Sequence, residues 1–249
     1  MSESAESQRE DQPVFVRLRH LELLATLVAI IVVQSFLSGG SAVQRVIFNV
    51  LFFAVVLSAV RTLSRSKGNM LFSIALGLVA FVGSCLAEGY QSKPLLTVVY
   101  LAYLAVFGSL LVALCESVFG PGPPDADRIV GAIAIFFVLG LIWALIYCLL
   151  EIYQPTAFAL PVLDNRGIQQ DMVSEFIYFS NVTLTTLGYG DIVPVTKPAR
   201  MIANLEAMTG QMYIAIVIAR LVGLQISYRI HEENNGRQEQ QSVEQDHGS

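Results

Sequence analysis

The chain has 249 residues, of which 54% are hydrophobic and 14% charged, and its mean hydropathy is +0.60. This composition is too apolar for an ordinary soluble domain, so the sequence predicts an integral membrane protein. The net charge of −5 argues against a partner made of nucleic acid. Three cysteines without CxxC or Cys/His spacing indicate neither a disulfide framework nor a metal centre, and we expect no enzyme chemistry and no cofactor.

Apolar stretches with few charges predict six membrane spans, given that a helix needs about 20 residues to cross a bilayer. In chain order they are 21–37, 46–60, 69–87, 94–115, 129–150 and 201–226. The second is short, but Arg45 and Arg61 can extend it by reaching toward the headgroups. The first could instead be a signal peptide; its long acidic leader and Glu22 favour an uncleaved helix.

The positions of lysine and arginine predict the orientation. The segment RTLSRSK between spans two and three is the clearest basic loop. Cytoplasmic loops carry the excess of Lys and Arg, so we expect both termini in the cytoplasm. The protein is then a multi-pass component of the plasma (inner) membrane, surrounded by lipids.

The segment between spans five and six combines an irregular outer loop with a short helix and a glycine-containing turn. Residues 172–185 are apolar and aromatic enough for a helix but too few to cross, so they predict a re-entrant helix. The stretch TTLGYGDIVP, residues 185–194, follows directly. Non-helical backbone at membrane depth is tolerated only where it is buried in protein or lines a water-filled path.

The glycines of this turn indicate what it can bind. Gly188 and Gly190 can adopt backbone angles that other residues avoid. Alternating with Leu187 and Tyr189, they could aim consecutive carbonyls in one direction. Such a column of oxygens, joined by the Thr186 hydroxyl, can replace the hydration shell of a monovalent cation.

The sequence TTLGYGD, residues 185–191, resembles the selectivity filter of the tetrameric potassium channels. The family usually has Val or Ile at the position of Leu187. Pro194, Arg200 and Gly210 follow the filter at familiar distances, and the resemblance covers about residues 129–227.

The resemblance implies roles for individual residues. The carbonyls of Thr186, Leu187, Gly188 and Tyr189, with the Thr186 side chain, would bind K⁺ in a filter completed by Gly190. The expected filter supports are Asp191, Tyr178 and Thr185, with Asp191 accepting a hydrogen bond from Tyr178. Tyr178 and Phe179 would form an aromatic cuff, whereas Val182 stands where many prokaryotic relatives have a second supporting Glu.

One chain supplies one such loop, and a ring of carbonyls needs four. We therefore expect a homotetramer with closed cyclic symmetry, with K⁺ as the permeant ion.

Span six predicts a cavity face. Gly210, Ile214, Ile218 and Val222 recur at helical spacing, with Gln211 beside them. They could line a cavity and a gate, or they could pack against span five.

Two charges lie within span six and are suspects for function. Glu206 could bond to a hydroxyl of the short helix or pair with a neighbouring subunit. For Arg220, we expect the side chain to reach the inner headgroups rather than to gate.

The charges in span four indicate whether the protein can sense voltage through this helix. It contains no Lys or Arg between Lys93 and Arg128, so a membrane potential has no charge to act on there.

The predicted fold class is therefore an all-α membrane protein with six transmembrane helices and a re-entrant pore helix and filter between spans five and six. Its expected parts are a polar cytoplasmic N-terminus (1–20), a four-helix membrane domain (21–116), a Gly/Pro linker (117–128), a pore domain (129–227, with the filter at 186–191) and a disordered cytoplasmic tail (228–249).

The sequence favours a potassium-selective channel that conducts passively. Three alternatives stay open: a weakly selective cation channel, a non-conducting membrane subunit with the same fold, and a transporter with a glycine-rich re-entrant loop.

Overall fold

The computed structural model describes residues 19–36, 50–55, 75–84, 86, 92–120, 126–160 and 168–247. The labelled helices are α1 (Arg19–Phe36), α4 (Lys93–Phe119), α5 (Ala126–Tyr153), α6 (Ile168–Leu184) and α7 (Lys197–His247). Residues 50–55 and Ala75–Ser84 are also helical. Two short strands, β1 (Phe158–Ala159) and β2 (Val193–Pro194), pair antiparallel.

Three of the described helices are long and apolar enough to cross a membrane: Lys93–Phe119, Ala126–Tyr153 and Lys197–Arg220. They correspond to predicted spans four, five and six; the first two are a few residues longer than predicted, and the third begins and ends a few residues earlier than predicted. Predicted span one corresponds to α1, which contains a shorter apolar helix, His20–Val33. Predicted spans two and three lie partly outside the described residues, so the count of six stays a prediction.

The local sequence accounts for several helix ends. Pro94 lies in the first turn of α4, where its missing N–H costs no hydrogen bond, and Gly120 follows the last turn. Asp127 lies in the first turn of α5, where a negative charge favours the exposed N–H groups. Because α4 runs to Phe119 and α5 starts at Ala126, the predicted 117–128 linker is shorter than expected; residues 121–125 lie outside the described part.

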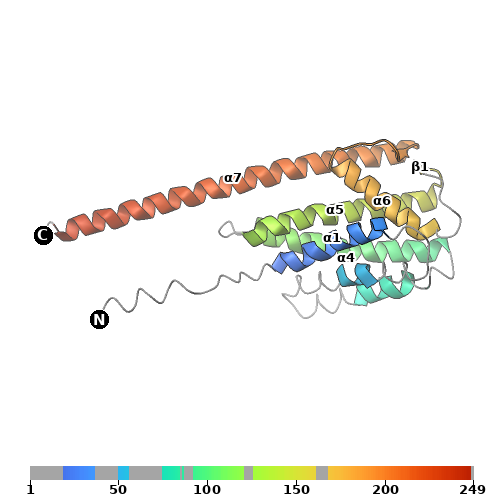
Figure 1. The fold of residues 1–249 in the computed structure, drawn as a ribbon, viewed down its shortest axis with the longest axis horizontal. Coiled ribbons are helices and arrows are strands. Elements are labelled where there is room, and N and C mark those ends of the chain that lie inside the picture. Colours follow the sequence, from blue (N-terminus) through green and yellow to red (C-terminus); the bar gives the residue numbers. More distant parts are fainter. Residues whose placement is uncertain are drawn as a thin grey trace.

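Helix α5 is the centre of the bundle and contacts α1, α4, α6 and α7. Figure 1 shows α1, α4 and α5 running along the bundle and α6 crossing it obliquely beside the start of α7. Tyr147, Phe107 and Phe176 are the largest fully buried side chains. The core therefore continues from α4 through α5 to α6.

Helix α7 extends far beyond the bundle (Figure 1). The expected disordered tail at 228–249 is not what the structure shows, since α7 continues to His247. Gln and Glu are good helix formers, and lengthening an existing helix avoids the cost of nucleating a new one. The tail is therefore helical up to His247, where the sequence predicted disorder.

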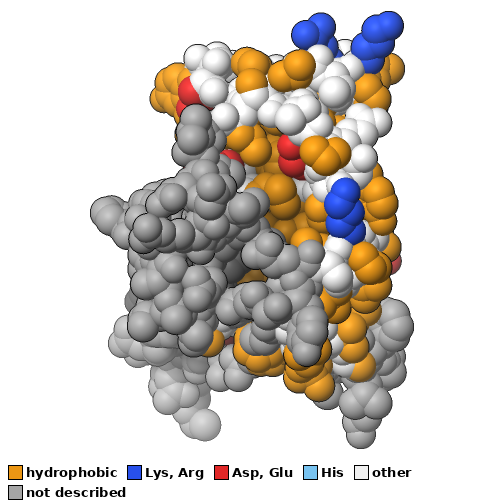
Figure 2. Space-filling model, turned by 90° about the vertical axis from the view of Figure 1, so that its right-hand side faces the viewer, with side chains coloured by type: hydrophobic (Ala, Val, Ile, Leu, Met, Phe, Trp, Pro, Cys, Tyr) orange, Lys and Arg blue, Asp and Glu red, His pale blue; other side chains and the backbone are white. Residues whose placement is uncertain are grey.

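Many large apolar side chains are exposed on the described helices. Figure 2 views the end of the bundle that carries β1, where hydrophobic side chains are widespread and Lys and Arg are few. Such a surface suits a lipid or protein environment rather than water.

Candidate functional site

The backbone of the re-entrant loop, residues 185–191, alternates in handedness. Thr186, Gly188 and Gly190 have φ of 58°, 60° and 79°, whereas neither Leu187 nor Tyr189 has a positive φ. The left-handed conformation costs a non-glycine residue about 1–2 kcal/mol, and such strain clusters at functional sites. The alternation is what consecutive carbonyls need in order to face one side.

Hydrogen bonds fix the direction of those carbonyls. The amide N–H groups of Leu187 and Gly188 both donate to the carbonyl oxygen of Val182 in α6, at 2.9 and 3.4 Å. In a trans peptide the carbonyl points opposite to the N–H. The carbonyls of Thr186 and Leu187 therefore both point away from α6, and two successive oxygens share one face of the loop.

The outer end of the loop is tied to α6. Tyr178 Oη donates a hydrogen bond to Asp191 Oδ2 at 2.7 Å, as the sequence led us to expect. This bond lowers the pKa of the Asp191 carboxyl and raises the pKa of Tyr178 to about 12. Both shifts favour the pair of an ionised carboxylate and a protonated phenol.

The inner end of the loop continues the last turn of α6. Thr185 Oγ1 donates to the Asn181 carbonyl at 2.7 Å, and the amide N–H of Thr186 donates to the Thr183 carbonyl at 3.0 Å. The Thr185 hydroxyl thus closes the helix end rather than joining the row of carbonyls.

The expected aromatic cuff is divided between two environments. Tyr178 is exposed and serves Asp191, whereas Phe179 is buried. The Phe179 ring lies 5.2 Å from that of Tyr147 and 5.5 Å from that of Phe158. Neighbouring positions on α6 therefore support the loop and anchor the helix in the core, respectively.

An outer scaffold holds the residues that follow the loop. Phe158 pairs with Pro194, and the Val195 amide donates to the Ala157 carbonyl at 2.7 Å. The Glu151 carboxylate accepts the amides of Thr156 at 2.6 Å and Phe158 at 3.2 Å. Glu151 was not among the predicted site residues, although an acid at the end of an apolar span, just before the turn sequence QPT, is a usable signal.

Gly210 on α7 packs against the end of α6. A Cβ at this position would lie 2.3 Å from the Leu184 carbonyl oxygen, and the residue is buried. Gly210 therefore does not share the open face expected for it.

The residues that follow Gly210 do present an open face. Gln211 Nε2 donates to Thr186 Oγ1 at 3.3 Å, which places this amide at the inner end of the loop. Further along α7, exposed side chains continue the row at four-residue spacing: Ile214, Ile218 and Val222.

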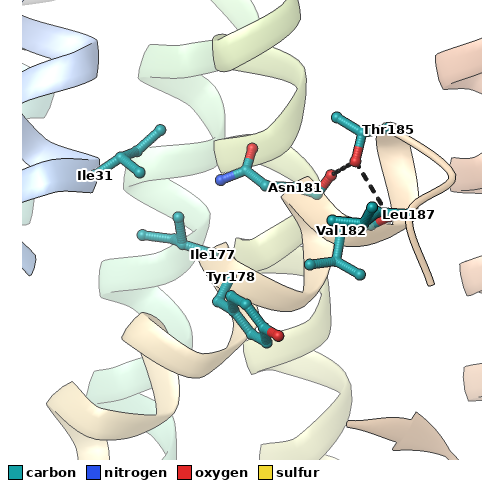
Figure 3. Close-up of a pocket in the computed structure, with 7 residues that line it drawn as sticks. All are labelled: Ile31, Ile177, Tyr178, Asn181, Val182, Thr185 and Leu187. Carbon is teal, nitrogen blue, oxygen red and sulfur yellow. Dashed lines mark hydrogen bonds between the residues drawn. The ribbon is translucent and has the colours of Figure 1, made fainter. Parts of the chain in front are cut away.

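A cavity of about 220 Å³ lies beside the loop. Figure 3 shows its lining, which comes from α1, α6 and the loop: Ile31, Ile177, Tyr178, Asn181, Val182, Thr185 and Leu187. Most of these side chains are apolar. Val182 is one of the buried residues of this lining. It stands at the position where a second supporting Glu was expected to be missing.

Arg220, near the middle of α7, holds this helix to the end of α4. Its Nη2 donates to the carbonyls of Phe119 and, at 3.2 Å, Gly120, and its guanidinium lies 5.3 Å from the centre of the Phe119 ring. Arg128 Nη1 donates to the same Gly120 carbonyl at 2.8 Å. The guanidinium thus binds the carbonyl end of a neighbouring helix, and its expected reach to the inner headgroups stays a prediction.

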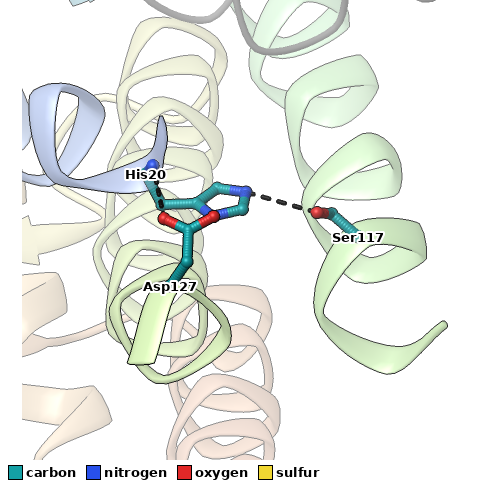
Figure 4. Close-up of polar contacts among 3 residues, drawn as sticks. All are labelled: His20, Ser117 and Asp127. Carbon is teal, nitrogen blue, oxygen red and sulfur yellow. Dashed lines mark hydrogen bonds and ion pairs between the residues drawn. The ribbon is translucent and has the colours of Figure 1, made fainter. Parts of the chain in front are cut away.

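The same end of the bundle contains a network of polar contacts. His20 Nδ1 lies 2.8 Å from Asp127 Oδ2, the His20 amide donates to Asp127 Oδ1 at 3.0 Å, and Ser117 Oγ lies 3.3 Å from His20 Nε2. Figure 4 shows the three side chains converging from the starts of α1 and α5 and the end of α4. This network positions the helices and lies far along the bundle from the loop.

Known proteins match the chain over this region. Residues 133–224 match the family model described as "Ion channel". Over 86 residues, 34% of this chain, it is 30% identical to the potassium voltage-gated channel subfamily A member 5 of Oryctolagus cuniculus, covering 14% of that protein. Over 81 residues it is 30% identical to subfamily A member 2 of Xenopus laevis, which is 32% of this chain and 16% of that protein. The matched region is thus about one seventh of each relative.

These matches define the class of protein. The chain is a membrane protein that contains an ion channel pore domain, and this domain is distantly similar to that of voltage-gated potassium channels. The family that residues 133–224 match is one of ion channels and not of enzymes, as the sequence led us to expect.

Proposed function

We propose that the protein is a homotetrameric, potassium-selective channel that conducts K⁺ passively across the plasma (inner) membrane. The observation that carries the proposal is the alternating backbone of the re-entrant loop, whose positive φ angles recur at Thr186, Gly188 and Gly190. Four such loops around an axis would surround a dehydrated cation with carbonyl oxygens.

The proposed K⁺ sites are formed by backbone rather than side chains. The carbonyls of Thr186, Leu187, Gly188 and Tyr189 would form successive rings, with the Thr186 hydroxyl at the inner end and Gly190 allowing the last turn of the backbone. Leu187 then contributes mainly its carbonyl, so a branched Leu in place of Val or Ile is compatible with selectivity.

The homotetramer is supported by the apolar surface of α7. Exposed hydrophobic side chains follow one face of this helix at helical spacing: Met201, Leu205, Met208, Met212 and Ile216. A single chain leaves this face without a protein partner, and closed symmetry covers such faces. The site is also incomplete in one chain, since one loop supplies only one carbonyl to each ring.

The inner half of α7 would line the cavity and the gate. Gln211 would face the ion just inside the loop, while Ile214, Ile218 and Val222 would form apolar rings that can close by dewetting. In this arrangement the starts of α1 and α5 lie at the cytoplasmic end, as do both termini.

In this proposal the channel does not open in response to a membrane potential acting on α4. This helix carries no Lys or Arg after Lys93, and moving one charge through 100 mV is worth about 2.3 kcal/mol. A helix without charges receives no such energy. The match to the ion channel family covers residues 133–224 and does not include this helix.

The test is the reversal potential of the reconstituted protein in planar bilayers with K⁺ on one side and Na⁺ on the other. The proposal predicts a reversal potential far from zero, with the sign that opposes the flow of K⁺ out of the side that contains it. A potential near zero would support the weakly selective cation channel, and absence of current would support a non-conducting subunit. Saturable uptake coupled to a second solute would indicate a transporter.

A further inference from the structure

Glu206 lies in the first half of α7 and is completely buried, with 0% of its surface exposed. An ionised carboxylate in such a place is costly unless a cation or several hydrogen-bond donors compensate it. Among the residues that the structure describes, no Lys, Arg or His lies within ion-pair distance of Glu206. What surrounds its two oxygens is therefore decisive.

Two hydroxyl groups meet the carboxyl group, one from each neighbouring helix. Tyr147 Oη of α5 donates to Glu206 Oε2. Ser180 Oγ of α6 lies within hydrogen-bond distance of Glu206 Oε1. The same Ser180 Oγ also lies 2.8 Å from the Gly140 carbonyl oxygen of α5.

The number of protons available to these oxygens bears on the protonation state of Glu206. Three oxygen pairs are in contact: Tyr147 with Glu206, Glu206 with Ser180, and Ser180 with Gly140. A carbonyl oxygen has no proton and each hydroxyl has one, so Tyr147 and Ser180 supply two protons for three contacts. Either the Ser180 proton is shared between Gly140 and an ionised Glu206, or the third proton is on the carboxyl group of Glu206, which gives every contact a proton of its own and removes the cost of a buried charge.

We infer that Glu206 is a neutral, protonated acid that acts as a positioning residue for the re-entrant helix α6. Its Oε1–H donates to Ser180 Oγ, whose own proton goes to the Gly140 carbonyl, while Oε2 accepts from Tyr147. This chain of hydrogen bonds joins α5, α6 and α7 at one point, and every proton in it has an acceptor.

The position of the network relates it to ion selectivity, and this step rests on the proposed function. Ser180 lies six residues before Thr186 and two residues after Tyr178. Tyr178 holds the outer end of the loop through Asp191, whereas Ser180 holds α6 from its buried side. The second support that is missing at Val182 is thus supplied from the opposite side of α6.

The Glu206→Gln variant distinguishes a neutral acid from a carboxylate. Gln places an NH₂ group and a carbonyl oxygen where the protonated acid has its O–H and its carbonyl oxygen, so its amide can donate to Ser180 and its oxygen can accept from Tyr147. Glu206→Ala removes both contacts. Ser180→Ala breaks the link to α6 and leaves Glu206 with Tyr147.

The experiment measures the K⁺/Na⁺ permeability ratio of the full-length protein in planar bilayers. We expect Glu206→Gln to keep the ratio within about twofold of the unaltered protein and the two Ala variants to lower it about tenfold, as expected when buried hydrogen bonds are lost. A Gln variant as impaired as the Ala variants, or Ala variants with unaltered selectivity, would overturn the inference. An unaltered protein without K⁺ current would instead refute the proposed function.

Infrared difference spectroscopy gives an answer that does not depend on conduction or on the folding of the Ala variants. The spectrum of the unaltered protein minus that of Glu206→Gln should contain the C=O stretch of a protonated carboxylic acid. Carboxylate bands in its place would show that Glu206 is ionised and would overturn the inference.

Discussion

Tyr178 on α6 donates a hydrogen bond to Asp191 at the outer end of the re-entrant loop, with 2.7 Å between the two oxygens. The two residues are thirteen positions apart in the sequence and enclose the whole loop. Their contact therefore ties the helix that precedes the re-entrant loop to the turn that follows it.

Replacing Tyr178 by Phe removes this bond and little else. We expect K⁺ current to decline about three- to tenfold faster when external K⁺ is lowered, in line with the usual net worth of one hydrogen bond. Tyr153→Phe is the matched control, because Tyr153 Oη contacts Thr97 away from the loop. Equal behaviour of the two variants would contradict a supporting role for Tyr178.

The same pair defines a pH window. The pKa of Asp191 is lowered, so its contribution is present above the ordinary Asp value of about 3.9 and is lost as the pH falls through the lower folded-state value. The pKa of Tyr178 is raised to about 12, so its contribution is present below the ordinary value of about 10 and is lost as the pH rises toward 12.

Selectivity measured against external pH should therefore be flat between about pH 5 and 9. A titration of selectivity inside this window that disappears in Tyr178→Phe would contradict this account of the pair.

Gly210 and Gly223 both lie on α7 but differ in the space around them, so their Ala variants can be compared. An added Cβ at Gly210 would lie 2.3 Å from a backbone oxygen of α6, whereas nothing lies within 4 Å of one at Gly223. We expect Gly210→Ala to lower the thermal midpoint in detergent, since overpacking costs roughly 1–3 kcal/mol. Gly223→Ala should leave the midpoint unchanged or raise it, because Ala is the better helix former. Similar midpoints for both would show that α6 and α7 do not pack this closely.

Arg220 should matter for stability and not for selectivity. Replacing it by Gln removes a charged donor from the Phe119 and Gly120 carbonyls, which we expect to cost about 1–2 kcal/mol and to lower the thermal midpoint. Arg220 lies nine residues beyond Gln211, or about 13 Å along the helix, so the permeability ratio should not change.

The control for Arg220 is Arg200→Gln. Arg200 is exposed and donates to the Pro194 carbonyl, so its loss should shift the midpoint less. A larger shift for Arg200 than for Arg220 would contradict the role given to the inner contact.

Local chemistry explains which features could be predicted from the sequence. The positions of α4, α5 and α7 followed from runs of apolar residues, and the alternating loop followed from two glycines flanking Tyr189. The bond between Tyr178 and Asp191 was expected only through resemblance, because no local pattern links residues thirteen apart.

Contacts between distant segments were not predictable in the same way. The sequence marks Glu206 and Arg220 as charges in a span, but their partners Tyr147, Ser180 and Phe119 come from other helices and depend on how the bundle packs. The tail beyond residue 227 was misjudged because low hydrophobicity was given more weight than the helix propensity of its Gln and Glu residues.

The central claim is that the left-handed glycines of the re-entrant loop create the K⁺ path, and the most direct test compares Gly188→Ala with Gly108→Ala. Neither added methyl group has a neighbour within 4 Å, but only Gly188 has a positive φ, at 60°. The measurement is K⁺ efflux from vesicles that contain the protein, with Na⁺ outside. We predict efflux that Gly188→Ala abolishes or opens to Na⁺ and that Gly108→Ala leaves unchanged; selective efflux that survives in Gly188→Ala would contradict the claim.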